Sequence, residues 1–383
     1  MRIFPAELEE RAFRHARVRE WKDAGLVSAQ TAANIGAEIG EAPARAAWPL
    51  RVVLFGFSGL CLSACIGLFT IGIRDRTAIG VWCLVWAVIA VAAGETLIRA
   101  LKAYRQGAEE ALAAAAVVLC AFGAERLFGG AGRSWDFSTE LFSFALAAAS
   151  ALAYARYGYR LAAIGVAVGL GVLVSSSSGS VNAARVELAA LYAALLAAVT
   201  FWPDLPRRER ERLEIARFFL ALSVPLCLNL RLERIAGGYA YGGGLDAFAA
   251  ATLAAIVLIP AAVLAWGVSS RARALIWAGG IGFLIALCSV KPYLGIARNS
   301  WDPAVLGAAL IAAALILKRW LDAAPAGRRG AYSSQELAGD RGGGALGLLA
   351  GVVAAAPGTA PSGPDVPRGQ GGNFGGGGAS GAF

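Results

Sequence analysis

Residues 50–73 read LRVVLFGFSGLCLSACIGLFTIGI, and apart from Arg51 none of these side chains carries a charge. An apolar run of this length is enough for a helix of roughly 20 residues, which is what crossing a bilayer requires, with some tilt. The stretch therefore predicts a membrane-spanning helix. It is the clearest of several such stretches, and short loops rich in arginine separate them.

The composition of the whole chain agrees with this interpretation. Of its 383 residues 58% are hydrophobic and only 16% are charged, too few for a soluble domain to cover its surface. We therefore predict an all-α, polytopic transmembrane bundle in residues 50–321. About ten spans are expected, over residues 50–73, 78–98, 111–128, 139–155, 161–177, 184–202, 213–232, 246–268, 274–290 and 303–319.

Two of these spans are short. Leu141–Ala155 and Leu161–Val174 each offer only about 15 uncharged residues, which is less than a full crossing. One of them could be re-entrant or buried between other helices. Nine or eleven spans therefore remain as alternatives.

The arginines in short loops predict the orientation. With ten spans both termini lie on one side, and that side carries the basic loops Arg99–Arg105 and Arg207–Arg212. The positive-inside rule then makes the termini cytoplasmic. The formal net charge of +9 follows from this topology and from attraction to membrane lipid, so no nucleic-acid partner is expected.

Residues 1–49 differ from the rest, because charged side chains are dense between Glu7 and Asp23. The segment reads as water-exposed, and its charge argues against a signal peptide. An imperfect helical stripe ends at Trp21, Gly25 supplies a stop, and Ser28 is a good N-cap for a second helix over Ala29–Ile39. We therefore predict a cytoplasmic helical hairpin. Its apolar residues could close it on itself or dock a protein partner; they are Leu26, Val27, Ile35 and Ile39.

The sequence WKDAGLVS at residues 21–28, followed by a helix with Gln30, Ala33 and Ile35, carries a resemblance. It resembles the N-terminal hairpin of a bacterial family of predicted membrane proteins, domain-of-unknown-function family twenty-one fifty-seven. The likeness covers about 30 residues and implies a hairpin in front of a multi-pass region. It implies no catalytic residue, because the family has no established activity.

Cysteine and histidine offer little chemistry. All six cysteines fall inside predicted spans, and Cys61 and Cys65 lie four apart on one helical face. Two thiolates without further ligands make a poor metal site. His15 is the single histidine and lies in the polar arm, which excludes haem held by histidine pairs and a Ser-His-Asp triad in the membrane. We expect no metal and no cofactor.

Carboxylates near the membrane are costly and therefore candidates for function. Four of them lie at span ends, and each is close in sequence to an arginine; they are Glu95, Glu125, Glu187 and Glu214. An ion-paired helix end explains each as well as a proton relay does.

The seventh span is the most irregular. Pro225 removes a backbone donor, and Asn229 and Arg231 bring polar groups just beyond it. Broken helices flanked by polar groups build substrate sites in many transporters, although proline kinks also occur in helices that transport nothing. The candidate site residues are Pro225, Asn229, Arg231, Lys291, Tyr293 and Arg298.

Residues 322–383 are rich in Gly, Pro and Ala and are expected to be largely disordered. The glycines at 237–244 lack the context of a phosphate-binding loop and read as a plain loop. The sequence thus predicts a structural or regulatory membrane protein acting through partners, and no enzyme. A solute or ion transporter is the alternative, and an intramembrane or lipid-modifying enzyme ranks third.

Overall fold

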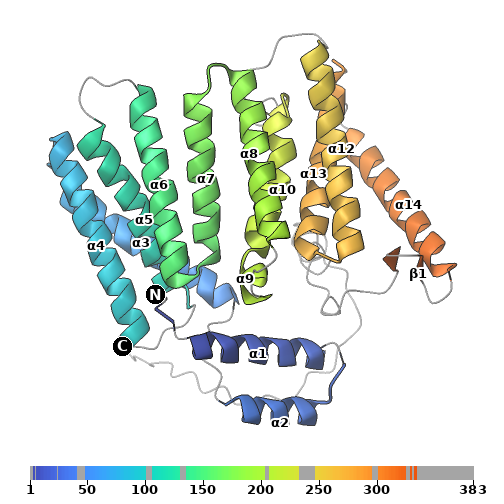
Figure 1. Cartoon of the computed structure of the whole chain (residues 1–383), viewed down its shortest axis with the longest axis horizontal. Helices are drawn as coiled ribbons and strands as arrows, with labels where there is room; N and C mark the ends of the chain where they lie inside the picture. Colours follow the sequence, from blue (N-terminus) through green and yellow to red (C-terminus); the bar gives the residue numbers. More distant parts are fainter. Residues whose placement is uncertain are drawn as a thin grey trace, which may run out of the picture. The chain divides into compact units, whose positions relative to one another are not determined.

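The computed structural model of the chain describes residues 3–4, 6–23, 25–40, 48–100, 106–129, 135–202, 207–232, 246–295, 301–324, 328–329 and 332–333. In these ranges the protein is helical apart from one short strand pair (Figure 1). Eight helices are long and apolar enough to cross a membrane, which confirms the predicted polytopic all-α bundle. They are α3 (Trp48–Thr70), α4 (Arg76–Ala100), α5 (Ala108–Phe128), α6 (Trp135–Tyr157), α7 (Arg160–Ser177), α8 (Val181–Phe201), α12 (Ala247–Ser270) and α13 (Arg273–Tyr293).

The other described elements are shorter or more polar. They are α1 (Ala6–Asp23), α2 (Ala29–Ile39), α9 (Arg207–Arg212), α10 (Glu214–Leu228), α14 (Asp302–Asp322) and the antiparallel strands β1 (Arg328–Arg329) and β2 (Tyr332–Ser333). The predicted loop at 237–244, Arg298 and nearly all of the predicted tail lie outside the described residues.

The eight helices correspond to the predicted spans other than 213–232 and 303–319. The two short spans, 139–155 and 161–177, lie within continuous helices of 23 and 18 residues. The span at 213–232 was predicted too long, because α10 has 15 residues and ends at Leu228. At 1.5 Å per residue α10 is about 22 Å long, less than the roughly 30 Å of a hydrocarbon core. The span at 303–319 lies within α14.

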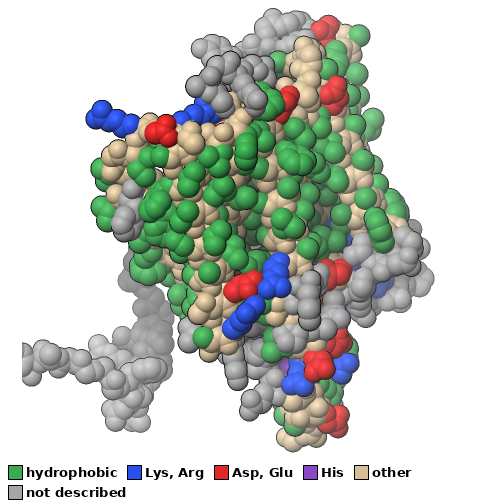
Figure 2. Space-filling view, turned by 60° about the vertical axis from the view of Figure 1, so that its left-hand side comes forward, with side chains coloured by type: hydrophobic (Ala, Val, Ile, Leu, Met, Phe, Trp, Pro, Cys, Tyr) green, Lys and Arg blue, Asp and Glu red, His purple; other side chains and the backbone are tan. Residues whose placement is uncertain are grey.

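Exposed apolar side chains cover the outside of the long helices. On α3, Phe57, Leu60 and Leu68 are more than half exposed, and α4 and α12 expose Val88 and Leu258 in the same way. Figure 2 shows that apolar side chains fill the middle of one face and that charged ones gather above and below. Such a surface suits hydrocarbon as solvent, so the chain is an integral membrane protein in contact with lipid.

Small residues let neighbouring helices approach closely. A Cβ on Gly169 of α7 would lie 2.6 Å from the backbone N of Ala147 on α6. Between α12 and α13, a Cβ on Gly279 would lie 2.5 Å from the backbone N of Leu264. Close backbone approach is how membrane helices gain packing energy without a hydrophobic effect between them. The largest buried cluster joins α7, α8, α10, α12 and α13 around Tyr192 and Leu220.

The predicted hairpin forms, with Ser28 as the N-cap of α2. Its Oγ accepts a hydrogen bond from Thr31 N at 3.0 Å, and Gly25 adopts a positive φ of 70° at the turn. The hairpin also packs on one end of the bundle, across which α1 lies (Figure 1). The backbone N of Ile3 donates to the carbonyl of Arg156 at 3.0 Å, and Phe4 meets Tyr159 edge to face. We call this end of the bundle the α1 side.

An ion pair between α1 and α9 completes this contact. Arg212 Nη2 lies 2.5 Å from Glu9 Oε1, and the two side chains are only 7% and 4% exposed. Arg212 also pairs with Glu209 at 2.8 Å, and Arg17 pairs with Glu211 at 3.1 Å. The sequence predicted the hairpin but not its attachment to α9, which lies about 200 residues further along the chain.

Candidate polar site at the break of α10

The end of α10 lies among buried polar groups. Pro225 lies inside the helix and lacks an N–H, so the buried carbonyl of Ala221 loses its usual intrahelical partner. The helix continues for three residues after Pro225, and Asn229 N closes it on the carbonyl of Leu226 at 3.1 Å. A Cβ on Gly282 of α13 would lie 3.6 Å from Pro225 Cγ, so α13 passes close to the proline.

Asn229 ties three segments together. Its side chain is buried, with the residue 1% exposed, and its Nδ2 donates to Ser289 Oγ on α13 at 2.7 Å. Its Oδ1 accepts from Arg231 N at 3.0 Å, and its carbonyl accepts from Arg185 Nη1 of α8 at 3.2 Å. The amide thus stabilises the turn that follows α10 and holds it against α8 and α13.

Tyr293 makes the second set of contacts. Its hydroxyl accepts from Leu230 N at 2.8 Å and lies 3.3 Å from the carbonyl of Leu228 and 3.4 Å from Thr252 Oγ1. The hydroxyl has one proton, so only one of the last two groups receives it at a time. The guanidinium of Arg231 lies over the Tyr293 ring, 5.7 Å from its centroid, at cation–π distance.

The structure therefore brings together three of the predicted site residues, Asn229, Arg231 and Tyr293. Pro225 lies one turn before Asn229 in α10, and half-buried Lys291 lies two residues before Tyr293 in α13. Arg298 lies outside the described residues. Arg185, Thr252 and Ser289 complete the cluster and were missed. The i, i+4 spacing of Ser289 and Tyr293 was a signal for the last of these.

The chemistry of this cluster is that of a capped helix end. Two guanidinium groups, Arg185 and Arg231, lie near the C-terminal end of α10, where the helix dipole is negative. The two guanidinium groups bring positive charge to the cluster, and positive charge favours an anion over a metal ion. Its amide, hydroxyl and backbone groups bond to one another.

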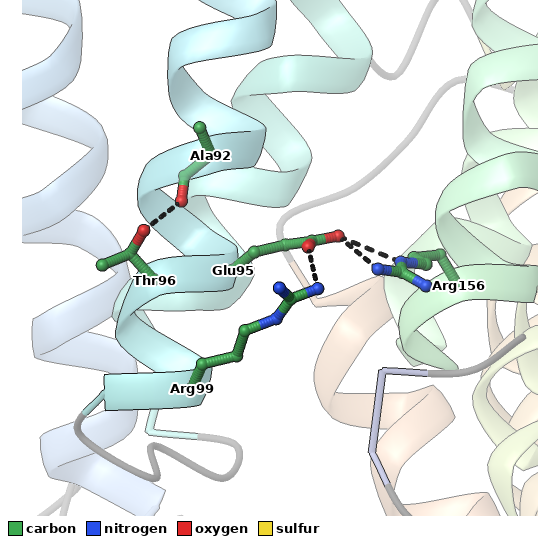
Figure 3. A network of polar contacts seen from close by, with 5 residues as sticks. All are labelled: Ala92, Glu95, Thr96, Arg99 and Arg156. Atoms are coloured by element: carbon green, nitrogen blue, oxygen red, sulfur yellow. Dashed lines mark hydrogen bonds and ion pairs between the residues drawn. The ribbon is translucent and has the colours of Figure 1, made fainter.

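The predicted carboxylates occupy other places. Glu95 forms the expected i, i+4 pair with Arg99, at 2.8 Å, on the last turns of α4. Figure 3 shows that it also receives Nε and Nη2 of Arg156 from α6, at 3.0 and 2.8 Å. The ion pair across helices was not predicted, because the two residues are 61 positions apart. Glu95 links α4 to α6 at the α1 side.

The remaining carboxylates are spread over both ends of the bundle. Glu125 pairs with Arg76 of α4 at 2.5 Å and with Arg126. Glu187 accepts from the hydroxyl of Ser178 at 2.5 Å, and Arg185, two residues before Glu187, donates to the carbonyl of Asn229. Glu214 begins α10 at the α1 side. These four carboxylates are not gathered at one depth.

One buried carboxylate escaped the sequence analysis. Glu109, in the first turn of α5, is 1% exposed, and its Oε1 accepts from Gln106 N at 2.7 Å. Its Oε2 has no hydrogen-bond partner among the described residues. A glutamate in the first turn of a helix often caps a backbone N–H just before the helix, so the position of Glu109 was a signal for this role. Its neighbour Glu110 pairs with Arg51 of α3 through two contacts.

The cysteines are all free thiols, and within the described part of the chain His, Cys, Asp and Glu form no group of three or more able to hold a metal. No protein-family model, curated protein or solved structure matches the chain. The resemblance of residues 21–28 to a family of membrane proteins therefore stays a prediction.

Proposed function

We propose that this integral membrane protein is a scaffold that presents its N-terminal hairpin to a protein partner at the α1 side. The observation that carries the proposal is the buried Glu9–Arg212 pair, which fixes α1 to the bundle. A hairpin held at a buried ion pair and at Phe4 has one orientation relative to the membrane, so a partner bound to it is positioned as well.

The turn of the hairpin offers the docking patch. Trp21 is 43% exposed and Leu26 is 67% exposed, although both lie outside the predicted spans. Exposed apolar side chains on a water-facing element are typical of binding surfaces, and tryptophan is enriched among the residues that dominate binding. Charged Lys22 and Asp23 lie beside them in sequence, as at the polar rim of an interface.

The α1 side is proposed to be cytoplasmic, in a bacterial inner membrane. Arg156, Arg160, the arginines of α9 and Arg273 all lie at this end of the helices, which supports the assignment by the positive-inside rule. We also propose that the chain belongs to the family whose N-terminal hairpin it resembles.

Cross-linking in native membranes tests the scaffold. The full-length chain is cross-linked and its partners are identified, alongside the variants Leu26→Asp and Gln30→Asp. We expect a defined partner to be captured by the natural chain and by Gln30→Asp, which adds the same charge to an exposed polar position of α2. Leu26→Asp should lose it. An unchanged set of partners with Leu26→Asp would contradict the proposal.

The buried cluster at the break of α10 favours a second candidate, passage of a small anionic solute. Two arginines beside a helix that ends inside the bundle are the supporting observation. Protein-dependent flux of anions into liposomes should fall with Asn229→Ala or Arg231→Ala and should persist with Arg99→Ala, an exposed arginine of α4. Silence across a panel of solutes excludes this candidate. An enzyme would need carboxylates or serines gathered at one depth, and the scattered glutamates do not support one.

A further inference from the structure

Glu109 is the most deeply buried carboxyl group in the described part of the chain. Two carboxylates are buried there, Glu9 at 5% exposed and Glu109 at 1%. Glu9 has Arg212 as an ion-pair partner, whereas no ion pair joins Glu109 to a described residue. Its Oε1 accepts from Gln106 N at 2.7 Å, and its Oε2 has no hydrogen-bond partner among the same residues. One oxygen atom of a buried carboxyl group is therefore left without a donor.

The helices around the start of α5 close over this carboxyl group. A Cβ on Gly107 would collide with the carbonyl oxygen of Arg51, so the chain just before α5 lies directly against α3. On α4, a Cβ on Gly94 would lie 3.9 Å from the carbonyl oxygen of Glu109, and Ile98, one turn further along, is 8% exposed. Water therefore has little access to the Glu109 side chain.

The arginines described at this end of the neighbouring helices have other carboxylates as partners. Arg51 of α3 pairs with Glu110 through two contacts. Two more pair with Glu95; they are Arg99 of α4 and Arg156 of α6. The basic residues of the connection between α4 and α5 lie outside the described residues; they are Lys102 and Arg105. Ionised Glu109 would thus add a negative charge beside Glu110 without a described cation of its own.

A proton is the ligand that fits this site. A carboxylate is costly to bury without a compensating cation, and a proton on Oε2 removes that charge. The hydrogen bond from Gln106 N goes to Oε1, so it is kept whether the proton is bound or released. Carboxyl groups that exchange protons within membrane helices are the units from which proton relays are built.

We propose that Glu109 is a proton-binding site, and that its Oε2 takes up a proton while Glu110 and Glu95 stay ionised. The proton comes from the α1 side, because Glu109 lies in the first turn of α5, at that end of the bundle. The site does not involve the hairpin turn, so it stands independently of the scaffold proposal.

Infrared spectroscopy of the full chain in lipid nanodiscs tests the proton. A protonated carboxyl group has a C=O stretching band that is separate from the bands of a carboxylate. At roughly pH 6 a glutamate in water is almost wholly ionised. We expect the natural chain to show the band of a protonated carboxyl group at this pH, Glu110→Gln to keep the band and Glu109→Gln to lose it. Absence of the band from the natural chain overturns the proposal, as does an unchanged band in Glu109→Gln.

Chemical labelling identifies the residue without a variant, and it decides the outcome if Glu109→Gln does not fold. Dicyclohexylcarbodiimide is apolar, and a protonated carboxyl group adds across one of its C=N bonds. The carboxyl oxygen joins the central carbon, the proton goes to nitrogen, and no group leaves. We expect mass spectrometry of fragments of the natural chain to find this adduct on Glu109 and not on Glu110. Failure to label Glu109, or labelling of Glu110 in preference to it, overturns the proposal.

Discussion

Arg212 of α9 and Glu9 of α1 form a buried ion pair, 2.5 Å apart, at the point where the N-terminal hairpin meets the membrane bundle. A water-facing arm could have been joined to the spans by a loop alone. Instead, the contact buries two opposite charges, and removing one of them would leave the other buried at a large cost in free energy.

Removal of either charge should loosen α1. We expect Glu9→Gln and Arg212→Gln each to destabilise the docked arm by about 3 kcal/mol, since each removes one charge of a buried ion pair. The double variant should cost little more than the worse single variant, because the two act as a unit. Thermal unfolding in detergent measures all three.

Glu20→Gln is the matched control on the same helix. Glu20 pairs with Arg17 in a largely exposed setting, and its loss should cost less than about 1 kcal/mol. Additive effects of Glu9→Gln and Arg212→Gln would mean that the two side chains do not interact across the contact.

The hydrogen bonds of Asn229 give the second prediction. Asn229→Ala deprives Arg231 N and Ser289 Oγ of a buried partner, which should destabilise the protein by about 1 to 3 kcal/mol. Asn34→Ala removes the same group from exposed α2, where its Oδ1 accepts from Gln30 Nε2 at 3.3 Å, and should leave the melting temperature unchanged. Equal melting temperatures for the two variants would show that the hydrogen bonds of Asn229 do not stabilise the end of α10.

Two adjacent glycines of α13 give a matched pair of variants. A Cβ on Gly279 would lie 2.5 Å from the backbone N of Leu264, so Gly279→Ala must push α12 and α13 apart and should cost about 1 to 3 kcal/mol. Gly280 has nothing within 4 Å of such an atom, and Gly280→Ala should be neutral or stabilising. The order of the two melting temperatures decides the outcome, and the reverse order contradicts the packing of α13 on α12.

Two adjacent glutamates of α5 should respond differently to the same change. Glu110→Gln weakens the pair with Arg51 and should lower the melting temperature. Glu109→Gln keeps an oxygen for Gln106 N and removes a buried charge, so it should leave stability unchanged or raise it. If Glu109→Gln lowers the melting temperature more than Glu110→Gln does, the Glu109 carboxylate must have a stabilising partner besides Gln106.

The sequence predicted what depends on neighbouring residues. Apolar runs predicted about ten spans, and eight of them correspond to described helices long and apolar enough to cross a membrane. The hairpin followed from Gly25 and Ser28, and the i, i+4 spacing gave the Glu95–Arg99 pair. Each of these rests on contacts within one helix or one turn. The composition of residues 213–232 could not show that the helix would end at Leu228, because apolar side chains continue past the break.

The contacts between helices could not be predicted from the sequence. Glu95 with Arg156, Arg185 with Asn229 and Glu9 with Arg212 join residues far apart in the chain, and any arginine near a helix end was an equal candidate. The polar site was predicted in part because Pro225 marked the break. Its partners Thr252 and Ser289 did not stand out, since single hydroxyl residues are common in membrane helices.

Hydrogen exchange of the full chain in lipid nanodiscs tests the central claim most directly, which is that α1 is docked on the bundle. We expect the amides of residues 6–23 to be protected for hours in the natural chain and to exchange at least tenfold faster in Glu9→Gln, while those of α12 do not change. Exchange of residues 6–23 within seconds in the natural chain, with no effect of Glu9→Gln, would contradict it.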